Sequence, residues 1–229
     1  MNLDEAIDQL ERFVGDVRQS SLIDDKTSLG SALALRQEER LINEGKSTFN
    51  VVVFGDLNDF KHLNDEHGHE AGDVAITEVG KAIRSIVTES LDGRAYRLSG
   101  DEFIILLDQQ SVNGFLEAST SLANVVFSHY EKQLRTSMSF GYVVSDGKSS
   151  LSELQEQAEV ACQHAKVQGD GACVEWSNAI KSNPLVRRTA RCQQCGARIT
   201  CSIPKQNAPE RLGCCASCGA VFSSLEGDR

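Results

Sequence analysis

Long hydrophobic runs are missing from this chain of 229 residues. No stretch approaches the roughly 18 consecutive apolar residues that a transmembrane helix needs. The first residues, Met1 to Glu5, are acidic and lack the basic and then apolar order of a secretory signal peptide. The sequence therefore argues against a membrane-spanning or secreted protein, and we expect a cytoplasmic location without a membrane partner.

Positive charge is also scarce, since 23 Lys and Arg stand against 33 Asp and Glu, for a net charge of −10. Because contacts to nucleic-acid phosphates require basic surface, this balance argues against a main body that binds nucleic acid. The C-terminal part differs, because residues 181–229 hold eight Lys or Arg and three Asp or Glu, and six of the eight cysteines lie between 192 and 218. The composition therefore indicates two parts, an acidic main domain and a small cysteine-rich unit.

Hydrophobic periodicity predicts an α+β fold for the main domain. The apolar run before Asp56 is typical of a buried strand, and stripes at spacings of three and four residues mark helices. Thr27 is expected to cap the first helix of this domain, and Gly45 to follow its end. The expected helices are 27–44, 59–66, 70–88, 112–132 and 151–168, and the expected strands are 50–56, 94–98, 103–107, 136–144 and 172–176. From the strand at 50–56 to the strand at 136–144 these elements read βααββαβ, and they are built around one mostly antiparallel sheet.

The chain is expected to contain four parts. Residues 1–21 form a leader helix, with its apolar stripe at 3–17, that packs on the main domain or on a partner. The main domain spans 22–178, and a linker at 179–189, marked by Pro184, leads to a cysteine-rich unit at 190–222.

Three carboxylates are expected to meet at one edge of the sheet. Asp56 ends the buried strand, and Asp101 and Glu102 lie in the tight turn of the neighbouring hairpin. Hard carboxylate oxygens, completed by water and substrate phosphates, are the ligands that Mg²⁺ prefers. Strand-end and turn acids that are merely solvated are the alternative from these residues alone.

Longer motifs around these acids favour the metal site. Residues 54–73 read FGDLNDFKHLNDEHGHEAGD, residues 97–103 read RLSGDEF, and Ala158, Ala161 and Ala165 follow a small-residue pattern that ends in Lys166 and Gly169. Over residues 22–176 the chain resembles the GGDEF-domain diguanylate cyclase family, with SGDEF in place of the signature turn. The resemblance implies a GGDEF palm-like, ferredoxin-like domain that joins two GTP into cyclic di-GMP.

The resemblance also implies a catalytic centre. Asp56 and Asp101 would bind Mg²⁺ or Mn²⁺, assisted by the Leu57 carbonyl and by Glu102. Paired metals lower the pKa of the attacking 3′-hydroxyl and neutralise charge on the phosphates. Asp101 is the implied proton acceptor, and Lys61 is placed to offset charge that develops in the transition state.

The substrate GTP is implied to contact a second set of residues. An ionised Asp73 suits guanine, because a carboxylate only accepts hydrogen bonds and guanine offers N1–H and N2–H₂. Each domain would bind one GTP, so catalysis would need two half-sites facing each other in a homodimer. The implied substrate-binding residues are Asn64, His69, Asp73, Phe60, Gly100 and Lys166.

Several positions depart from the family pattern. Ser99 replaces the first glycine of the signature turn, and Asn58 replaces an Asp beside the metal ligands. Asp170 stands where the family offers an Arg to the triphosphate, and its charge is expected to repel phosphate. The early motif D-x-L-T-x-L-x-N-R survives only as Asp24, Thr27 and Leu29.

The cysteines of the C-terminal unit form two C-x-x-C-G motifs about twenty residues apart. Four thiolates at this spacing suit tetrahedral Zn²⁺, which would supply folding energy to a unit too small for a large core. The predicted ligands are Cys192, Cys195, Cys215 and Cys218. A redox pair or disulfide is the alternative. The segment resembles small zinc ribbons, and it would serve as a structural or dimer contact or would bind a protein partner or nucleic acid.

Three functional hypotheses follow. The first is an active diguanylate cyclase that releases two pyrophosphates. The second is a degenerate relative that binds GTP or a partner without turnover, which Ser99 and Asp170 favour. The third is a zinc-ribbon adaptor or nucleic-acid binder in which the main domain only dimerises.

Overall fold

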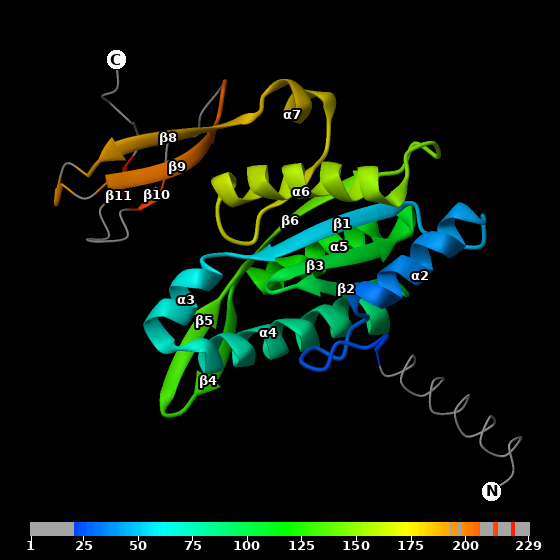
Figure 1. The fold of residues 1–229 in the computed structure, drawn as a ribbon, viewed down its shortest axis with the longest axis horizontal. Helices are drawn as coiled ribbons and strands as arrows, with labels where there is room; N and C mark the ends of the chain where they lie inside the picture. Colours follow the sequence, from blue (N-terminus) through cyan, green and yellow to red (C-terminus); the bar gives the residue numbers. More distant parts are fainter. Residues whose placement is uncertain (1–20, 193, 197, 207–212, 215–220, 223–229) are drawn as a thin grey trace, which may run out of the picture.

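A computed structural model describes residues 21–192, 194–196, 198–206, 213–214 and 221–222 (Figure 1). The predicted leader helix at 3–17 and two predicted zinc ligands, Cys215 and Cys218, lie outside these residues. In the part of the chain that is described, no helix has the length and hydrophobicity needed to cross a bilayer.

A mixed sheet forms the centre of the main domain. Within the described residues it has five strands in the order β2-β3-β1-β6-β7, antiparallel except for the parallel pair β6 and β7. This arrangement confirms the expected mostly antiparallel sheet. Its strands are β1 (Val51–Leu57), β2 (Arg94–Ser99), β3 (Glu102–Leu107), β6 (Met138–Val144) and β7 (Cys173–Glu175).

Helices cover both faces of the sheet (Figure 1). The longest described helix, α6, has the predicted bounds of 151–168 because Ser150 caps its first turn and the Glu153 carboxylate accepts a hydrogen bond from the Ser150 N–H. A π-helical turn over Ser85–Ser90 continues α4. The α-helices are α2 (Ala32–Asn43), α3 (Phe60–His67), α4 (His69–Arg84), α5 (Val112–Ser119), α6 (Leu151–Gln168) and α7 (Asn178–Ser182).

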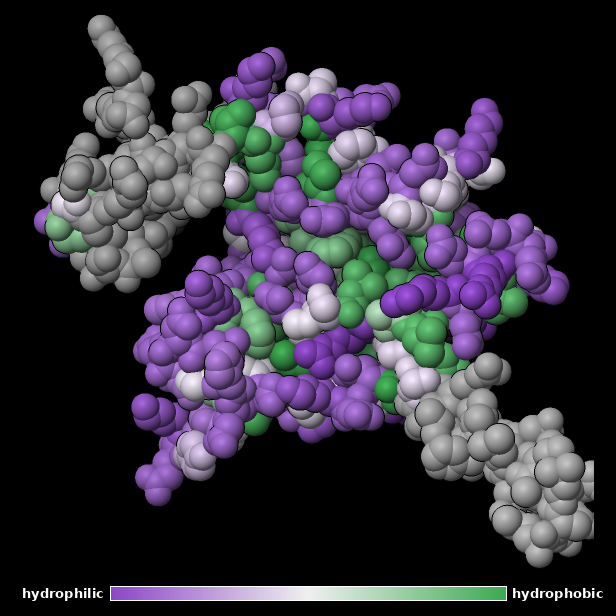
Figure 2. All heavy atoms as spheres, in the orientation of Figure 1, coloured by the Kyte–Doolittle hydropathy of each residue, from purple (hydrophilic) through white to green (hydrophobic). Residues whose placement is uncertain are grey.

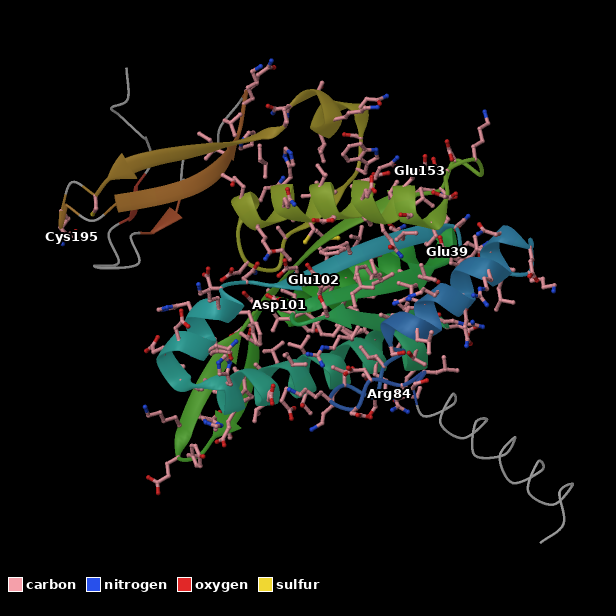
Figure 3. All side chains as sticks on the ribbon, in the orientation of Figure 1. Glu39, Arg84, Asp101, Glu102, Glu153 and Cys195 are labelled. Carbon is pink, nitrogen blue, oxygen red and sulfur yellow. The ribbon has the colours of Figure 1, made fainter. Side chains whose placement is uncertain are left out.

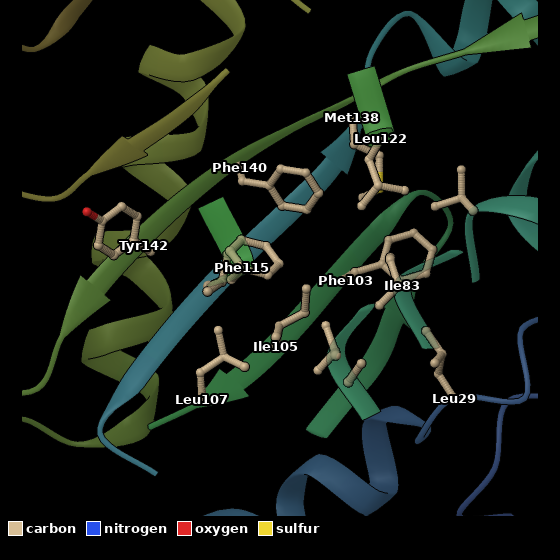
Figure 4. Packing of buried hydrophobic residues seen from close by; sticks show 14 of the residues in the cluster. Leu29, Ile83, Phe103, Ile105, Leu107, Phe115, Leu122, Met138, Phe140 and Tyr142 are labelled. Carbon is tan, nitrogen blue, oxygen red and sulfur yellow. The ribbon is translucent and has the colours of Figure 1, made fainter. Parts of the chain in front are cut away.

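Because helices cover both faces of the sheet, the core consists of two hydrophobic clusters, one on each face. Along β3, Phe103 and Ile105 face the cluster shared with α4 and α5, whereas Ile104 faces the cluster shared with α2 and α6. Figure 4 shows the first cluster, in which the rings of Phe115 and Phe140 meet edge to face with centroids 5.4 Å apart. Because both faces are buried, the apolar run of β1 needs no polar alternation. The outer surface seen in Figure 2 is mostly hydrophilic.

Helix α6 lies directly on the backbone of β6. A Cβ atom added at Gly141 would come within 2.1 Å of both the Ala158 oxygen and the Cys162 nitrogen. The small residues of α6, Ala158, Ala161 and Ala165, are fully buried on this side. The glycine and alanines therefore set the depth at which α6 and its Lys166 sit on the sheet.

Two predicted helices differ from the structure. The helix predicted at 112–132 ends at Ser119, and a hairpin of β4 (Val125–His129) and β5 (Lys132–Thr136) follows a 3₁₀ turn over Thr120–Ala123. The β-branched and aromatic run that opens β4 favours a strand over a helix. Helix α2 starts at Ala32 with Ser31 as its cap, so the cap predicted at Thr27 is wrong. Gly45 has the expected positive φ after α2.

The segment expected to be a linker, 179–189, contains most of α7 and the start of β8 (Leu185–Arg191). Strand β8 pairs with β9 (Arg198–Pro204), and β10 (Gly213–Cys214) pairs with β11 (Val221–Phe222). Strand β9 contacts α6. The linker therefore has regular structure, and the domain boundaries remain predictions.

We expect that Gly141→Ala will destabilise the main domain by about 1–3 kcal/mol, because the added methyl group must displace α6 from β6. Urea denaturation measures the change, and Ser152→Ala, on the exposed side of α6, is the control. An unchanged unfolding midpoint for Gly141→Ala would contradict the direct backbone contact.

Candidate active site

The ends of two neighbouring strands bring the predicted acids together. Asp56 at the end of β1 lies opposite Glu102 at the start of β3, and the Leu57 N–H donates to the Asp101 carbonyl at 3.3 Å. Figure 3 shows Asp101 and Glu102 at this edge of the sheet, near α3. The strand register thus places three carboxylate-bearing residues at one edge.

A lysine from α6 occupies the same place. Lys166 Nζ lies 2.7 Å from Asp56 Oδ1 and donates to the Leu57 carbonyl oxygen at 3.3 Å. Burial raises the pKa of Asp56; the Lys166 ammonium opposes this shift, and the charges of Asp101 and Glu102 add to it. The lysine therefore balances negative charge that the fold has concentrated there.

Asp56 and the Leu57 carbonyl offer hard oxygen atoms of the kind that Mg²⁺ prefers. Asp56 Oδ1 is buried and accepts no well-oriented hydrogen bond within the described residues, although Lys166 lies close to it. Glu102 accepts a hydrogen bond from Ser99 Oγ at 3.0 Å. No three His, Cys, Asp or Glu side chains of the described residues converge as a metal-binding cluster. A cation at Asp56 and the Leu57 carbonyl would therefore have to displace the Lys166 ammonium.

The signature turn is held by an arginine. Arg97 donates from Nε and from a terminal nitrogen to the Gly100 carbonyl oxygen, at 3.0 and 2.8 Å. Its other terminal nitrogen lies 3.2 Å from Asp24 in the N-terminal turn. Burial of Asp24 works against ionisation, but hydrogen bonds from Thr27 and the Arg97 charge hold its pKa below the usual value. Gly100 has a φ of +45° and an exposed backbone.

The residues implied to read the base lie on α3 and α4. A Cβ atom at Gly72 would come within 2.0 Å of Asn64 Oδ1, so the Asn64 side chain lies directly on α4 beside Asp73. The Phe60 ring is half-buried and packs against the core. The contact at Gly72 therefore places Asn64 against the turn of α4 that carries Asp73.

Asp73 has a partner that the sequence patterns did not reveal. Lys26, in the N-terminal turn, forms an ion pair with the Asp73 carboxylate, and both side chains are about half exposed. The side chains of Lys61 and His69 are exposed on the same pair of helices. Lys26 stands at the position of the leucine in the motif D-x-L-T. This charged residue is the one feature of the sequence that could have indicated the ion pair with Asp73.

One described cysteine of the predicted zinc site, Cys195, lies far from the carboxylates. Cys195 lies at the tip of the β8–β9 hairpin in Figure 3, well away from Asp101 and Glu102. Cys192 is buried and Cys195 is exposed. The described residues therefore contain half of the predicted ligand set and do not show a zinc ribbon.

Residues 21–172 match the family model "Diguanylate cyclase, GGDEF domain". The chain is 30% identical over 166 residues to the bifunctional diguanylate cyclase/cyclic di-GMP phosphodiesterase MucR of Pseudomonas aeruginosa. This match covers 71% of this chain and 23% of MucR. It is 32% identical over 157 residues to the diguanylate cyclase DgcN of Escherichia coli, and this match covers 66% of this chain and 38% of DgcN. The chain thus spans a minor part of these relatives.

Solved structures show the same fold. The diguanylate cyclase SiaD of Pseudomonas aeruginosa, solved in complex with its activator SiaC, superposes with a TM-score of 0.62 at 25% identity, covering 76% of this chain and 70% of SiaD. The coiled coil and GGDEF domain of DgcB from Caulobacter crescentus, in complex with c-di-GMP, gives a TM-score of 0.64 at 20% identity and covers 75% of this chain and 94% of that one. These likenesses confirm the predicted palm-like α+β fold. With the matched model, they show that the chain belongs to the GGDEF-domain diguanylate cyclase family.

Proposed function

We propose that this chain is a diguanylate cyclase that condenses two GTP into cyclic di-GMP and releases two pyrophosphates. The arrangement of Asp56, Asp101 and Glu102 beside Lys166 is the observation that carries the proposal. One domain offers one such edge, so two copies must face each other to join two nucleotides. The chain would therefore act as a homodimer, in the cytoplasm.

The catalytic centre would use Asp56, the Leu57 carbonyl, Asp101 and Glu102 to hold Mg²⁺ or Mn²⁺. Such a cation, when bound, neutralises phosphate charge and acidifies the attacking 3′-hydroxyl. Asp101 would accept the proton of that hydroxyl. Lys166, released from Asp56, would pair with the triphosphate through its long side chain.

The base would be read between α3 and α4. Asp73 and Asn64 would pair with the donor edge of guanine, His69 would contact the ribose, and Lys61 would offset charge at the reacting phosphate. Guanine must then displace Lys26 from Asp73. Because a surface ion pair of this exposure contributes at most about 1 kcal/mol, this competition leaves GTP binding possible.

A catalytically degenerate domain that binds GTP or a protein is the second candidate. Asp170 favours it, because a carboxylate replaces a phosphate-binding cation there, and so does Ser99, which replaces the first glycine of the signature turn. Purified protein incubated with GTP and Mg²⁺, followed by chromatography, separates the two candidates, since only an active cyclase accumulates cyclic di-GMP.

The proposed zinc ribbon at 190–222 would be a separate unit with a structural role or a protein partner. The doubled C-x-x-C-G spacing supports it, and its basic residues would also suit a nucleic-acid contact.

Asp101→Asn should lower the rate of cyclic di-GMP formation by about a hundredfold or more, because it removes a charge that acts on the developing transition state. Asp108→Asn, at the opposite end of β3, is the matched control and should retain wild-type activity. An Asp101→Asn protein that keeps most of its activity refutes the assignment.

Asp73→Ala should raise the KM for GTP and reduce the preference for GTP over ATP, because unpaired donors of guanine cost about 1–3 kcal/mol. Steady-state kinetics with each nucleotide measure both effects. Asp65→Ala, an exposed acid on α3, is the control. Equal turnover of ATP and GTP by the wild-type protein would rule out base reading by Asp73.

Elemental analysis should find about one zinc per chain, since four thiolates make one tetrahedral site. Cys195→Ser or Cys218→Ser should release the metal, whereas Cys214→Ser should retain it. Protein purified in reducing buffer without chelators and found free of zinc would show that the ribbon assignment is wrong.

A further inference from the structure

Two positions that depart from the family pattern contact each other. The side-chain nitrogen of Asn58 donates to Asp170 Oδ1 at 3.1 Å and to Ser137 Oγ at 2.9 Å. Ser139 Oγ in turn donates to Asn58 Oδ1 at 3.0 Å. Both amide hydrogens and the amide oxygen of Asn58 therefore have partners.

This network requires an amide at position 58. An amide nitrogen offers two donors, whereas a carboxylate offers none when ionised. An Asp at position 58 would face Asp170 across the 3.1 Å that the hydrogen bond now spans, and the like charges would repel. Asn58 and Asp170 are thus a matched pair, and the Asp170 carboxylate is engaged by the protein.

The pair lies beside the predicted cation ligands. Asn58 follows Leu57, whose carbonyl oxygen accepts from Lys166, and the Asn58 N–H donates to the Ser137 carbonyl at 2.8 Å. The peptide that carries the Leu57 oxygen is therefore held by both the backbone and the side chain of Asn58. This double attachment directs the Leu57 oxygen toward Lys166.

The other end of the pair belongs to the loop after α6. Asp170 lies four residues beyond Lys166 in the chain, and the neighbouring Gly171 N–H donates to the Met138 carbonyl at 2.9 Å. The bond between Asn58 and Asp170 consequently connects the end of β1 to the C-terminal end of α6. These two elements supply two of the proposed cation ligands, Asp56 and the Leu57 carbonyl, and the lysine that must exchange with the cation.

We infer that Asp170 is a positioning residue, which acts through Asn58 to hold the Leu57 carbonyl in place for a divalent cation. This role deepens the proposed cyclase function and rests on the proposed metal site. It replaces the earlier expectation that the Asp170 charge merely repels phosphate. The triphosphate would then be bound by Lys61 and Lys166, because the loop after α6 offers no cationic side chain at position 170.

Mn²⁺ binding to the full chain in the absence of nucleotide, measured by electron paramagnetic resonance, tests the positioning role of Asp170 separately from turnover. Asp170→Ala removes the acceptor and should weaken Mn²⁺ binding about tenfold, as loss of a residue that orients a ligand does. Asp170→Asn removes the same charge but retains an acceptor oxygen, so its affinity should stay close to wild type. Asp56→Asn defines the signal that remains when the site is lost.

A double-mutant cycle tests whether Asp170 acts through Asn58. Asn58→Ala combined with Asp170→Ala should bind Mn²⁺ no more weakly than the weaker single variant, because one bond is lost in each. Unfolding midpoints measured in urea should change little for Asp170→Ala, since the pair is exposed on one side. A loss of affinity that follows a loss of stability would point to a purely structural role and overturn the inference.

Three further results would overturn it. Asp170→Ala with wild-type affinity would show that the bond is not needed, and equal weakening in Asp170→Asn would show that charge alone matters. Wild-type protein without Mn²⁺ binding would remove the site itself. If the Mn²⁺ series behaves as expected but no cyclic di-GMP forms, the positioning role holds and the cyclase proposal fails.

Discussion

The antiparallel pairing of β1 with β3 is the constraint on which the rest of the site depends. Its register sets Asp56 opposite Glu102 and brings the turn with Asp101 to the end of β1. A slip of one residue would exchange the two faces of the strand and move every core side chain to the wrong cluster. The hydrophobic core thus enforces the register, and the register assembles the acids.

Negative charge gathered in this way needs compensation before any cation binds. Lys166 supplies it from α6, and the depth of α6 is set where Gly141 meets the backbone of the helix. A buried carboxylate without a partner would cost several kcal/mol or remain protonated. The packing of small residues on β6 is therefore also part of the electrostatics of the site.

Patterns along the chain predicted the elements whose signals are local. The apolar run of β1, the capped helix α6 and the acidic hairpin turn were all expected within about two residues of their observed bounds. The helix predicted at 112–132 was wrong because periodicity was extended across Val125 to Phe127, where β-branched and aromatic residues favour a strand. The predicted cap at Thr27 is wrong, because Asp24 Oδ1 accepts hydrogen bonds from both the N–H and the hydroxyl of Thr27, in a turn before the helix.

The contacts within the site were less predictable. Lys26 pairs with Asp73 across 47 residues, and Asn58 meets Asp170 across 112 residues. The spacing of residues along the sequence does not indicate such contacts, because the residues come together only in the folded protein. The sequence marked Asn58 and Asp170 as separate departures from a pattern, whereas their proximity makes them one feature.

The direct backbone contact between α6 and β6 has a kinetic consequence. The backbones of α6 and β6 are in direct contact at Gly141, and the ion pair of Lys166 with Asp56 lies at the end of a long side chain, so Lys166 can leave Asp56 by rotating about its own side-chain bonds. Rotamer changes of such partly exposed side chains take picoseconds to nanoseconds, far faster than helix or domain motions. Departure of the ammonium from this edge therefore needs only a local side-chain motion, and slower steps of the proposed reaction would come from elsewhere.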